Sequence, residues 1–179
     1  MKRLFLAIDI SDEIKKDIKN YQNALSEITK KSSITVLDNI HLTLHFFGDT
    51  ADEDLEKIKK LLKNISKYNS GIILETTRLG VFKRAREYLV WLGFKADDGL
   101  SNLKKTIDQT LSFEGFKIES REFKPHVTIA RRTSFKQSAR EIDEIKVIKR
   151  IQSVESLILY SSHFTHSGVQ YKAEEIIKL

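Results

Sequence analysis

Two short segments of the sequence repeat the same pair of residues, and these residue types could transfer protons. His41 with Thr43 and His126 with Thr128 both fit the pattern His-x-Thr followed by an apolar residue, and the two histidines, 41 and 126, are 85 positions apart. Each segment alternates in a way that predicts a β-strand. On a strand, residues two apart share one face at about 6.5 to 7 Å, so each histidine and its threonine can address one ligand from the same side.

Two imidazoles on opposite sides of one ligand suit displacement at phosphorus. One would take a proton from the attacking oxygen and the other would give one to the leaving oxygen, and the ordinary histidine pKa of about 6.5 permits either role. The hydroxyls of Thr43 and Thr128 could donate to the non-bridging oxygens, and Arg131 could add positive charge. Such a site requires no metal and no covalent nucleophile, which points to a strained phosphodiester such as a 2',3'-cyclic phosphate.

Each of these residues has an alternative interpretation, and a structural role is a stronger alternative for a single histidine than for the pair. A lone histidine on a strand is more often structural than catalytic. His41 and His45 have an H-x-x-x-H spacing, but on a strand they would stand roughly 13 Å apart, which disfavours a shared metal ion. The basic loop Lys83, Arg84 and Arg86 could follow an RNA backbone while Phe82 stacks on a base, or the loop could be a solvated turn.

The composition narrows the class of protein. The chain has 179 residues, 40% of them hydrophobic, and 31 Lys and Arg against 25 Asp and Glu, a formal charge of +6. These values predict one globular domain with a packed core, while the charge alone fits either an anionic partner or a merely soluble surface. The absence of cysteine excludes disulfides, thiolate metal sites and cysteine nucleophiles. No apolar segment approaches the roughly 20 residues of a membrane span and no signal peptide is recognisable, so we expect a cytoplasmic location.

Hydrophobic periodicity predicts the elements that must position the motifs. Strands are expected at Leu4–Ile8, Ile40–Gly48, Gly71–Val81, Glu87–Phe94, Phe123–Arg131, Val154–Tyr160 and Val169–Ile177, the last two forming a hairpin around Thr165–Gly168. Helices are expected from the N-cap residues Ser11 and Asp12 to Ile28, at Ala51–Lys67, at Asp98–Ser112 and as a short helix within 134–147.

Strict alternation on the first motif strand would place His41, Thr43 and His45 on one face. Phe47 would join them there, whereas Leu42, Leu44 and Phe46 would face the core.

The two motifs belong to a longer internal repeat. Phe5 precedes His41 by 36 positions and Val90 precedes His126 by 36, each in an apolar strand followed by an amphipathic helix. The chain therefore contains two copies of strand, helix and strand, which predicts an approximate twofold axis between the histidines.

With both motifs in order, the sequence resembles the bacterial and archaeal RNA 2',3'-cyclic phosphodiesterases, also called 2'-5' RNA ligases, of the two-histidine phosphoesterase superfamily. The resemblance covers essentially the whole chain and is carried by Arg3–Asp9, Asn39–Gly48, Leu89–Gly93 and Phe123–Arg131. It implies an α+β fold formed by one bilobal domain over residues 1–179. Two antiparallel β-sheets would carry helices on the outside and a central active-site groove.

The resemblance also implies an activity: metal-independent hydrolysis of RNA 2',3'-cyclic phosphate ends to 2'-phosphomonoesters, without cofactor or obligatory protein partner. It makes His41 the proton donor and His126 the proton acceptor, with Thr43 and Thr128 holding the phosphate. Arg131 is assigned to the phosphate from the residues alone, as the added positive charge. The residues by themselves leave the two histidines interchangeable. The reverse reaction, 2'-5' RNA ligation, and an RNA- or nucleotide-binding module without turnover are the alternatives. His45 stands where relatives often carry a basic or small residue, which could alter substrate contacts at the groove.

Overall fold

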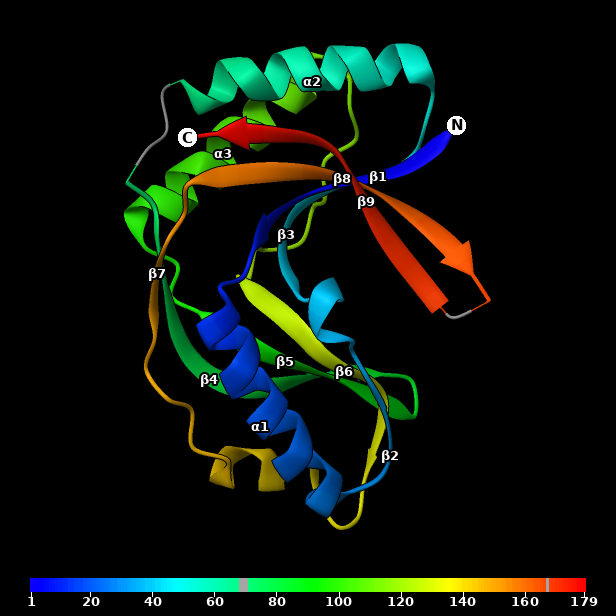
Figure 1. The fold of residues 1–179 in the computed structure, drawn as a ribbon, viewed down its shortest axis with the longest axis vertical. Helices are drawn as coiled ribbons and strands as arrows, with labels where there is room; N and C mark the ends of the chain where they lie inside the picture. Colours follow the sequence, from blue (N-terminus) through cyan, green and yellow to red (C-terminus); the bar gives the residue numbers. More distant parts are fainter. Residues whose placement is uncertain (68–70, 167) are drawn as a thin grey trace.

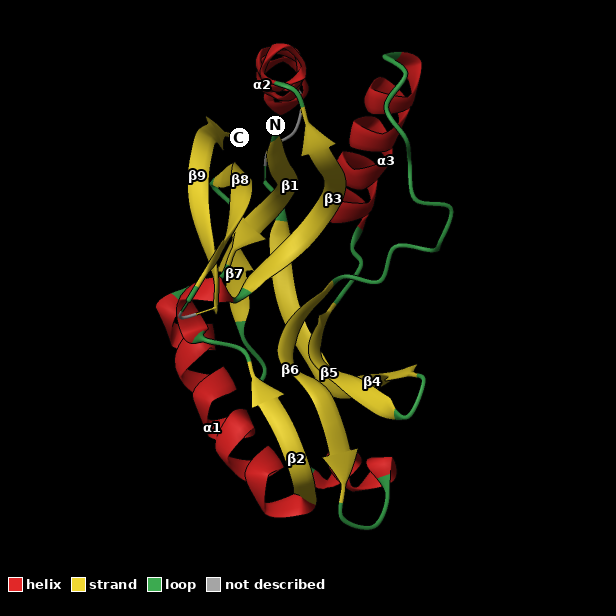
Figure 2. Ribbon diagram, turned by 90° about the vertical axis from the view of Figure 1, so that its right-hand side faces the viewer, coloured by secondary structure: helices red, strands yellow, loops and turns green. Residues whose placement is uncertain are grey.

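The computed structural model describes residues 1–67, 71–166 and 168–179. These residues form an antiparallel β-structure with helices on its outside (Figures 1 and 2). The elements in chain order are β1 Lys2–Asp9, α1 Asp12–Ile28, β2 Thr29–Ile34, the 3-10 helix η1 Leu37–Asn39, β3 His41–Thr50, α2 Asp52–Ser66, β4 Ile73–Arg84, β5 Glu87–Phe94, α3 Asp98–Phe113, β6 His126–Phe135, the 3-10 helix η2 Ala139–Glu144, β7 Ile151–Ser153, β8 Ser156–Thr165 and β9 Gly168–Lys178. None of the described helices is long and apolar enough to cross a membrane.

The order of the strands confirms the α+β class and the internal repeat. The order is β7-β4-β5-β6-β3-β1-β8-β9, with β2 paired to β6 outside this path. This order is symmetric about its centre. Strands β6 and β3 lie side by side there, β5 and β1 are the next strands outward on the two sides, and β4 and β8 follow them. The two predicted sheets meet at a single residue pair, Leu42 with Val127, which joins them into one connected order. Each of these residues directly follows a motif histidine, so the twofold axis passes between the two motifs.

The helices close the outer surfaces as their apolar stripes predict. Helix α1 begins at an N-cap where Ser11 Oγ accepts from the Ile14 backbone N–H at 3.4 Å. Its buried face includes Ile14, Ile18 and Leu25, and the helix lies along β2 and β6 (Figure 2). Helices α2 and α3 lie at the other end of the molecule. Their buried residues join the same apolar core as those of α1.

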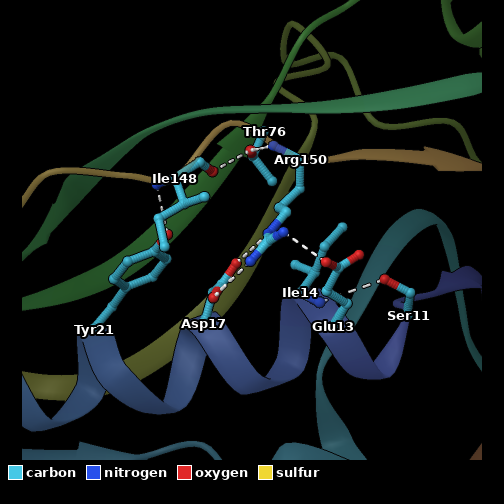
Figure 3. Close-up of polar contacts among 8 residues, drawn as sticks. All are labelled: Ser11, Glu13, Ile14, Asp17, Tyr21, Thr76, Ile148 and Arg150. Carbon is cyan, nitrogen blue, oxygen red and sulfur yellow. Dashed lines mark hydrogen bonds and ion pairs between the residues drawn. The ribbon is translucent and has the colours of Figure 1, made fainter.

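The segment between η2 and β7 returns the chain from the β6 half to the β8–β9 hairpin, and polar contacts tie it to α1 (Figure 3). Arg150 Nε donates to Asp17 Oδ2 at 2.6 Å, and the Arg150 backbone N–H donates to Thr76 Oγ1 at 2.8 Å. The Tyr21 hydroxyl accepts from the Ile148 backbone N–H at 2.8 Å. Because Asp17 is buried, the guanidinium of Arg150 supplies the positive partner that the Asp17 carboxylate needs.

Three features of the fold differ from the sequence predictions. Strand β2 was not predicted, because its six residues are mostly polar and its pairing with β6 creates it. The short strand β7 was also not predicted, and β6 begins at His126 and continues to Phe135. The short helix expected within 134–147 is η2, and the turn expected at the β8–β9 hairpin includes Ser167, which lies outside the described residues.

Candidate active site

The structure brings the two His-x-Thr motifs together on the central strands. His41 is the first residue of β3 and His126 is the first of β6. These antiparallel strands pair at Leu42 and Val127, so extending the register by one residue sets each histidine toward the threonine of the other motif. Both paired residues are fully buried, whereas the histidines and threonines are half-buried and share the opposite face.

Both imidazoles are oriented by the same backbone contact. His41 Nδ1 lies 2.9 Å from the carbonyl oxygen of Asn39, and His126 Nδ1 lies 2.6 Å from that of Lys124. A carbonyl oxygen only accepts, so Nδ1 carries the hydrogen in each ring and donates it. The Nε2 atoms are therefore the ones left to exchange a proton with a ligand, and the two copies of the repeat present them in the same way.

The surroundings of both imidazoles disfavour the protonated, charged form. Burial lowers the pKa of His41 to about 4, with Arg131 and His126 acting in the same direction and the Asn39 carbonyl and Asp9 opposing them. Burial also lowers the pKa of His126, aided by Arg131 and opposed by the Lys124 carbonyl. Arg131 thus lies within electrostatic reach of both rings, which places this predicted phosphate ligand with the histidines.

Aromatic side chains produce the burial around His41. Its ring centroid lies 4.7 Å from that of Phe5, 5.1 Å from Tyr171 and 6.3 Å from Tyr160. These residues come from β1, β9 and β8, so the three strands that follow β3 in the strand order form a wall beside it. Sequence reasoning gave none of them a place at the site, because the contact of Phe5 depends on the pairing of β1 with β3 and those of Tyr160 and Tyr171 depend on strand pairing across more than 100 residues.

A different pair of rings flanks His126. The Phe82 ring lies 5.1 Å from it and the Trp91 ring 6.2 Å. Trp91 lies against two glycines: a Cβ added to Gly80 would come within 2.3 Å of the indole, and one added to Gly93 within 2.9 Å. Both glycines are therefore required for the indole to lie flat on β4 and β5 next to the motif.

A β-bulge in β3 reverses the faces that strict alternation predicts for the residues after it. The adjacent residues Leu6 and Ala7 pair with His45 and Thr43, which are two positions apart, so Leu44 is an extra residue on β3. A bulge of this kind turns the side chains that follow it to the other face. His45 is therefore only 5% exposed and Phe46 is 60% exposed, the reverse of what strict alternation predicts.

Strand β6 carries the same bulge at the equivalent residue. Val90 and Trp91 are adjacent on β5 but pair with Ala130 and Thr128, so Ile129 is the extra residue on β6. The effect is also the same, because Ala130 is buried and Arg131 is exposed. Phe46 and Arg131, each five positions after a motif histidine, hence occupy equivalent places in the two halves.

His45 consequently contacts helix α3 and not the ligand side of β3, and the predicted role in substrate contacts at the groove is wrong. Its Nδ1 lies 3.9 Å from Asp108 Oδ1, and its ring packs against Phe47 at 4.6 Å. Burial lowers the pKa of His45, as does Lys104, whereas Asp108 and Glu119 raise it. Among the described residues, no three His, Asp or Glu side chains gather as a metal site would need.

Comparisons with known proteins agree with this arrangement. Residues 10–162 match the model of the 2'-5' RNA ligase superfamily. An RNA 2',3'-cyclic phosphodiesterase of Methanocaldococcus jannaschii is 32% identical over 98% of both chains, and one of Methanothermobacter thermautotrophicus is 26% identical over 99% of this chain and 98% of its own. The crystal structure of Escherichia coli LigT with 3'-AMP superimposes with a TM-score of 0.80 at 26% identity, covering 99% of this chain and 98% of that one.

Proposed function

The chain belongs to the 2'-5' RNA ligase superfamily, and on this ground we propose that it hydrolyses RNA 2',3'-cyclic phosphate ends to 2'-phosphomonoesters. The observation that carries the proposal is the pair of imidazoles on the adjacent strands β3 and β6, each held through Nδ1 by a backbone carbonyl. This geometry leaves two Nε2 atoms for one acid and one base on the same ligand, as hydrolysis of a cyclic phosphodiester requires.

In the proposed reaction, water attacks phosphorus in line with the bond to the ribose 3' oxygen. His126 Nε2 takes a proton from the water as the new P–O bond forms, and His41 Nε2 gives a proton to the 3' oxygen as the P–O3' bond breaks. The phosphate then remains on the 2' oxygen. Thr43 and Thr128 donate to the non-bridging oxygens, and the Arg131 guanidinium balances the charge that grows on them.

The chemical difference between the two halves supports this choice of acid and base. In an in-line reaction the ribose lies on the side of the leaving 3' oxygen, hence beside the acid, while water approaches from the side of the base. Both halves have aromatic rings next to the histidine, but at the position that the bulge exposes the His41 half carries the ring of Phe46, which is open to the attached nucleoside and lies 5.9 Å from Phe5. Arg131 comes from the strand of His126, where it can reach the phosphoryl oxygens.

Substrate binding also favours the protonated form of the imidazole that the acid needs. Because both histidine pKa values are lowered in the free protein, both rings are mostly neutral at pH 7. A bound phosphodiester anion favours the charged imidazolium and raises both values. The protonated form of His41 is therefore stabilised when the leaving oxygen is beside it.

The direct test is incubation of the protein with 2',3'-cyclic AMP in EDTA, with the products separated by chromatography. We expect 2'-AMP as the product and no loss of rate with chelator. Accumulation of 3'-AMP would reverse the assignment of the leaving oxygen, and a rate that disappears in EDTA and returns with a divalent cation would exclude the metal-independent mechanism.

Two alternatives use the same residues. RNA ligation through a 2'-5' bond opens the same cyclic phosphate with a 5' hydroxyl in place of water, so that P–O5' forms as P–O3' breaks, and it requires joined product at realistic concentrations of RNA ends. A binding module would bind a terminal phosphate tightly and hydrolyse no cyclic phosphate. A single bilobal domain over 1–179, a cytoplasmic location, and the lack of a cofactor or obligatory protein partner stay predictions of the sequence.

A further inference from the structure

The β4–β5 hairpin carries a cluster of cations that the proposed hydrolysis does not use. Lys83, Arg84 and Arg86 surround its turn and are exposed; we call them the basic tip. Within the described part of the chain they form no ion pair. Glu87, the carboxylate nearest to them in sequence, pairs instead with Lys31 at 3.8 Å. The basic tip therefore presents its positive charges to solvent without local neutralisation.

The basic tip is continuous with the wall of the candidate active site. Phe82, which contacts the ring of His126, immediately precedes Lys83, and Phe82 and Arg84 share one face of β4 because their pairing with β5 is regular. Two residues along a strand correspond to about 6.6 Å, so Arg84 stands one short step beyond the ring. On the other side of Phe82, the Arg78 guanidinium lies 5.6 Å from the Trp91 ring.

Two aromatic rings with a cation at each end thus lie along the hairpin beside the site. The order is Arg84, Phe82, Trp91 and Arg78, and the Phe82 and Trp91 rings lie 5.3 Å apart. Positive charge next to aromatic surface is the combination with which proteins bind single-stranded nucleic acids, since phosphates meet the cations and bases stack on the rings. Double-stranded RNA would instead need a broad surface that reads the shape of its minor groove.

The β8–β9 hairpin of the other half lacks this character. Its strand β8 takes the place of β4 in the repeat, and the sequence of its turn, 165–168, contains no lysine or arginine. Its carboxylates Glu174 and Glu175 pair with Lys2 at 2.6 Å and Lys63 at 2.8 Å. Figure 2 shows the two hairpins on opposite sides of the junction between β3 and β6. A polyanion that reaches the site is therefore drawn to the β4–β5 side.

We propose that the basic tip and Phe82 bind the nucleotides that precede the cyclic phosphate in a single-stranded RNA substrate. The inference rests on the proposed function for the position of the RNA end, and extends it to the strand behind that end. It makes the enzyme selective for RNA ends over cyclic mononucleotides, because a mononucleotide does not extend to the basic tip.

The test compares two substrates for one variant, Lys83→Ala/Arg84→Ala/Arg86→Ala. With a single-stranded RNA of about six nucleotides ending in a 2',3'-cyclic phosphate, we expect kcat/KM to fall by about tenfold or more at low salt. With 2',3'-cyclic AMP we expect a change of less than about twofold. The slope of log kcat/KM against log salt for the RNA should become shallower by about 0.7 for each phosphate that the variant no longer neutralises.

The matched control removes the same charge elsewhere. Lys16→Ala/Lys19→Ala/Lys105→Ala changes three exposed lysines on α1 and α3, and it should leave the RNA at the wild-type rate. Equal losses for both substrates, or an equal loss in the control, would overturn the proposal, as would inhibition by polyglutamate as strong as that by RNA, which would indicate an acidic protein partner.

If the wild-type protein hydrolyses neither substrate, the proposed function fails and the proposed strand site is tested separately. Fluorescence anisotropy with a labelled RNA that ends in a 3' hydroxyl measures strand binding without turnover. Weaker binding by the basic-tip variant than by the control variant supports the strand site, and equal binding excludes it.

Discussion

The half of the site around His41 and the half around His126 share a backbone and differ in chemistry. Each copy starts a central strand with the histidine, fixes its Nδ1 on a carbonyl and inserts one bulged residue after the threonine. The position that the bulge exposes is Phe46 in one copy and Arg131 in the other. In the proposed reaction, the duplication supplies two equivalent proton-transfer groups, and the divergence at the exposed position determines which side faces a nucleoside and which side faces phosphoryl charge.

The largest effects should come from removing either imidazole. His41→Ala and His126→Ala should each lower kcat by about 10³-fold, because each variant lacks one of the two proton transfers in the transition state. The two variants should differ in their pH profiles. Loss of the base removes the acidic limb of the kcat/KM profile and loss of the acid removes the alkaline limb, so His126→Ala should flatten the first and His41→Ala the second.

The wild-type profile gives an independent check on the same pair. Both pKa values are lowered in the free protein, so the bell of kcat/KM should be centred below pH 6.5, while substrate binding should move the bell of kcat to higher pH. The exposed His166→Ala is the control and should retain the wild-type profile. Exchanged limbs would reverse the roles of the two histidines, and an unaffected kcat in either variant would refute the two-histidine mechanism.

The second-largest effect on activity is expected at Arg131, the charged residue of the exposed pair Phe46 and Arg131. Arg131→Ala should lower kcat/KM by about 10²-fold, because the guanidinium stabilises charge that develops on the phosphoryl oxygens. Arg131→Lys keeps the charge without the planar donors and should recover part of the loss. Steady-state kinetics with a cyclic mononucleotide measures both variants.

The neighbouring Arg132→Ala is the matched control for charge, since Arg132 is also exposed and follows Arg131 directly. If Arg132→Ala costs as much as Arg131→Ala, the effect is a long-range field and not a contact, and the comparison of Phe46 with Arg131 loses its meaning.

The aromatic member should have a smaller effect, on binding more than on the chemical step. Phe46→Ala should raise KM for 2',3'-cyclic AMP by about tenfold with little change in kcat, since stacking on one base contributes about 1–3 kcal/mol. Phe46→Leu retains apolar area without a ring and should fall between the two. Phe113→Ala, an exposed phenylalanine at the end of α3, should have no effect. A loss in kcat alone would contradict a stacking role.

The sequence predicts the repeat better than it predicts the faces. A constant offset of 85 residues already places Leu42 against Val127, because antiparallel copies about a twofold axis must meet at equivalent residues. Faces depend on unbroken alternation, and the Leu44 bulge arises from pairing with β1 that no local pattern records. His45 was therefore assigned to the ligand side and Phe46 to the core, and both assignments were wrong. The aromatic wall around His41 was missed because it also depends on strand pairing, in this case of β1, β8 and β9, that no local pattern records.

The smallest effect on activity is expected at His45, whose position the sequence misjudged. His45→Leu should change kcat/KM by less than about threefold, because the side chain packs against α3 and not beside the phosphate. Its effect should appear in stability instead. The folded-state pKa of His45 is lowered, so below pH 6.5 the unfolded chain binds more protons than the folded chain, and the free energy of unfolding falls as the pH falls.

Leucine removes this contribution, so the decrease in stability between pH 7 and pH 5 should be smaller in His45→Leu than in the wild type. Urea unfolding at the two pH values measures it. His41 and His126 contribute in the same direction, so part of the pH dependence should remain in the variant. A large loss of activity would return His45 to the ligand side of β3, and an unchanged pH dependence would mean that the ring contacting Asp108 has the same pKa in the folded and the unfolded chain.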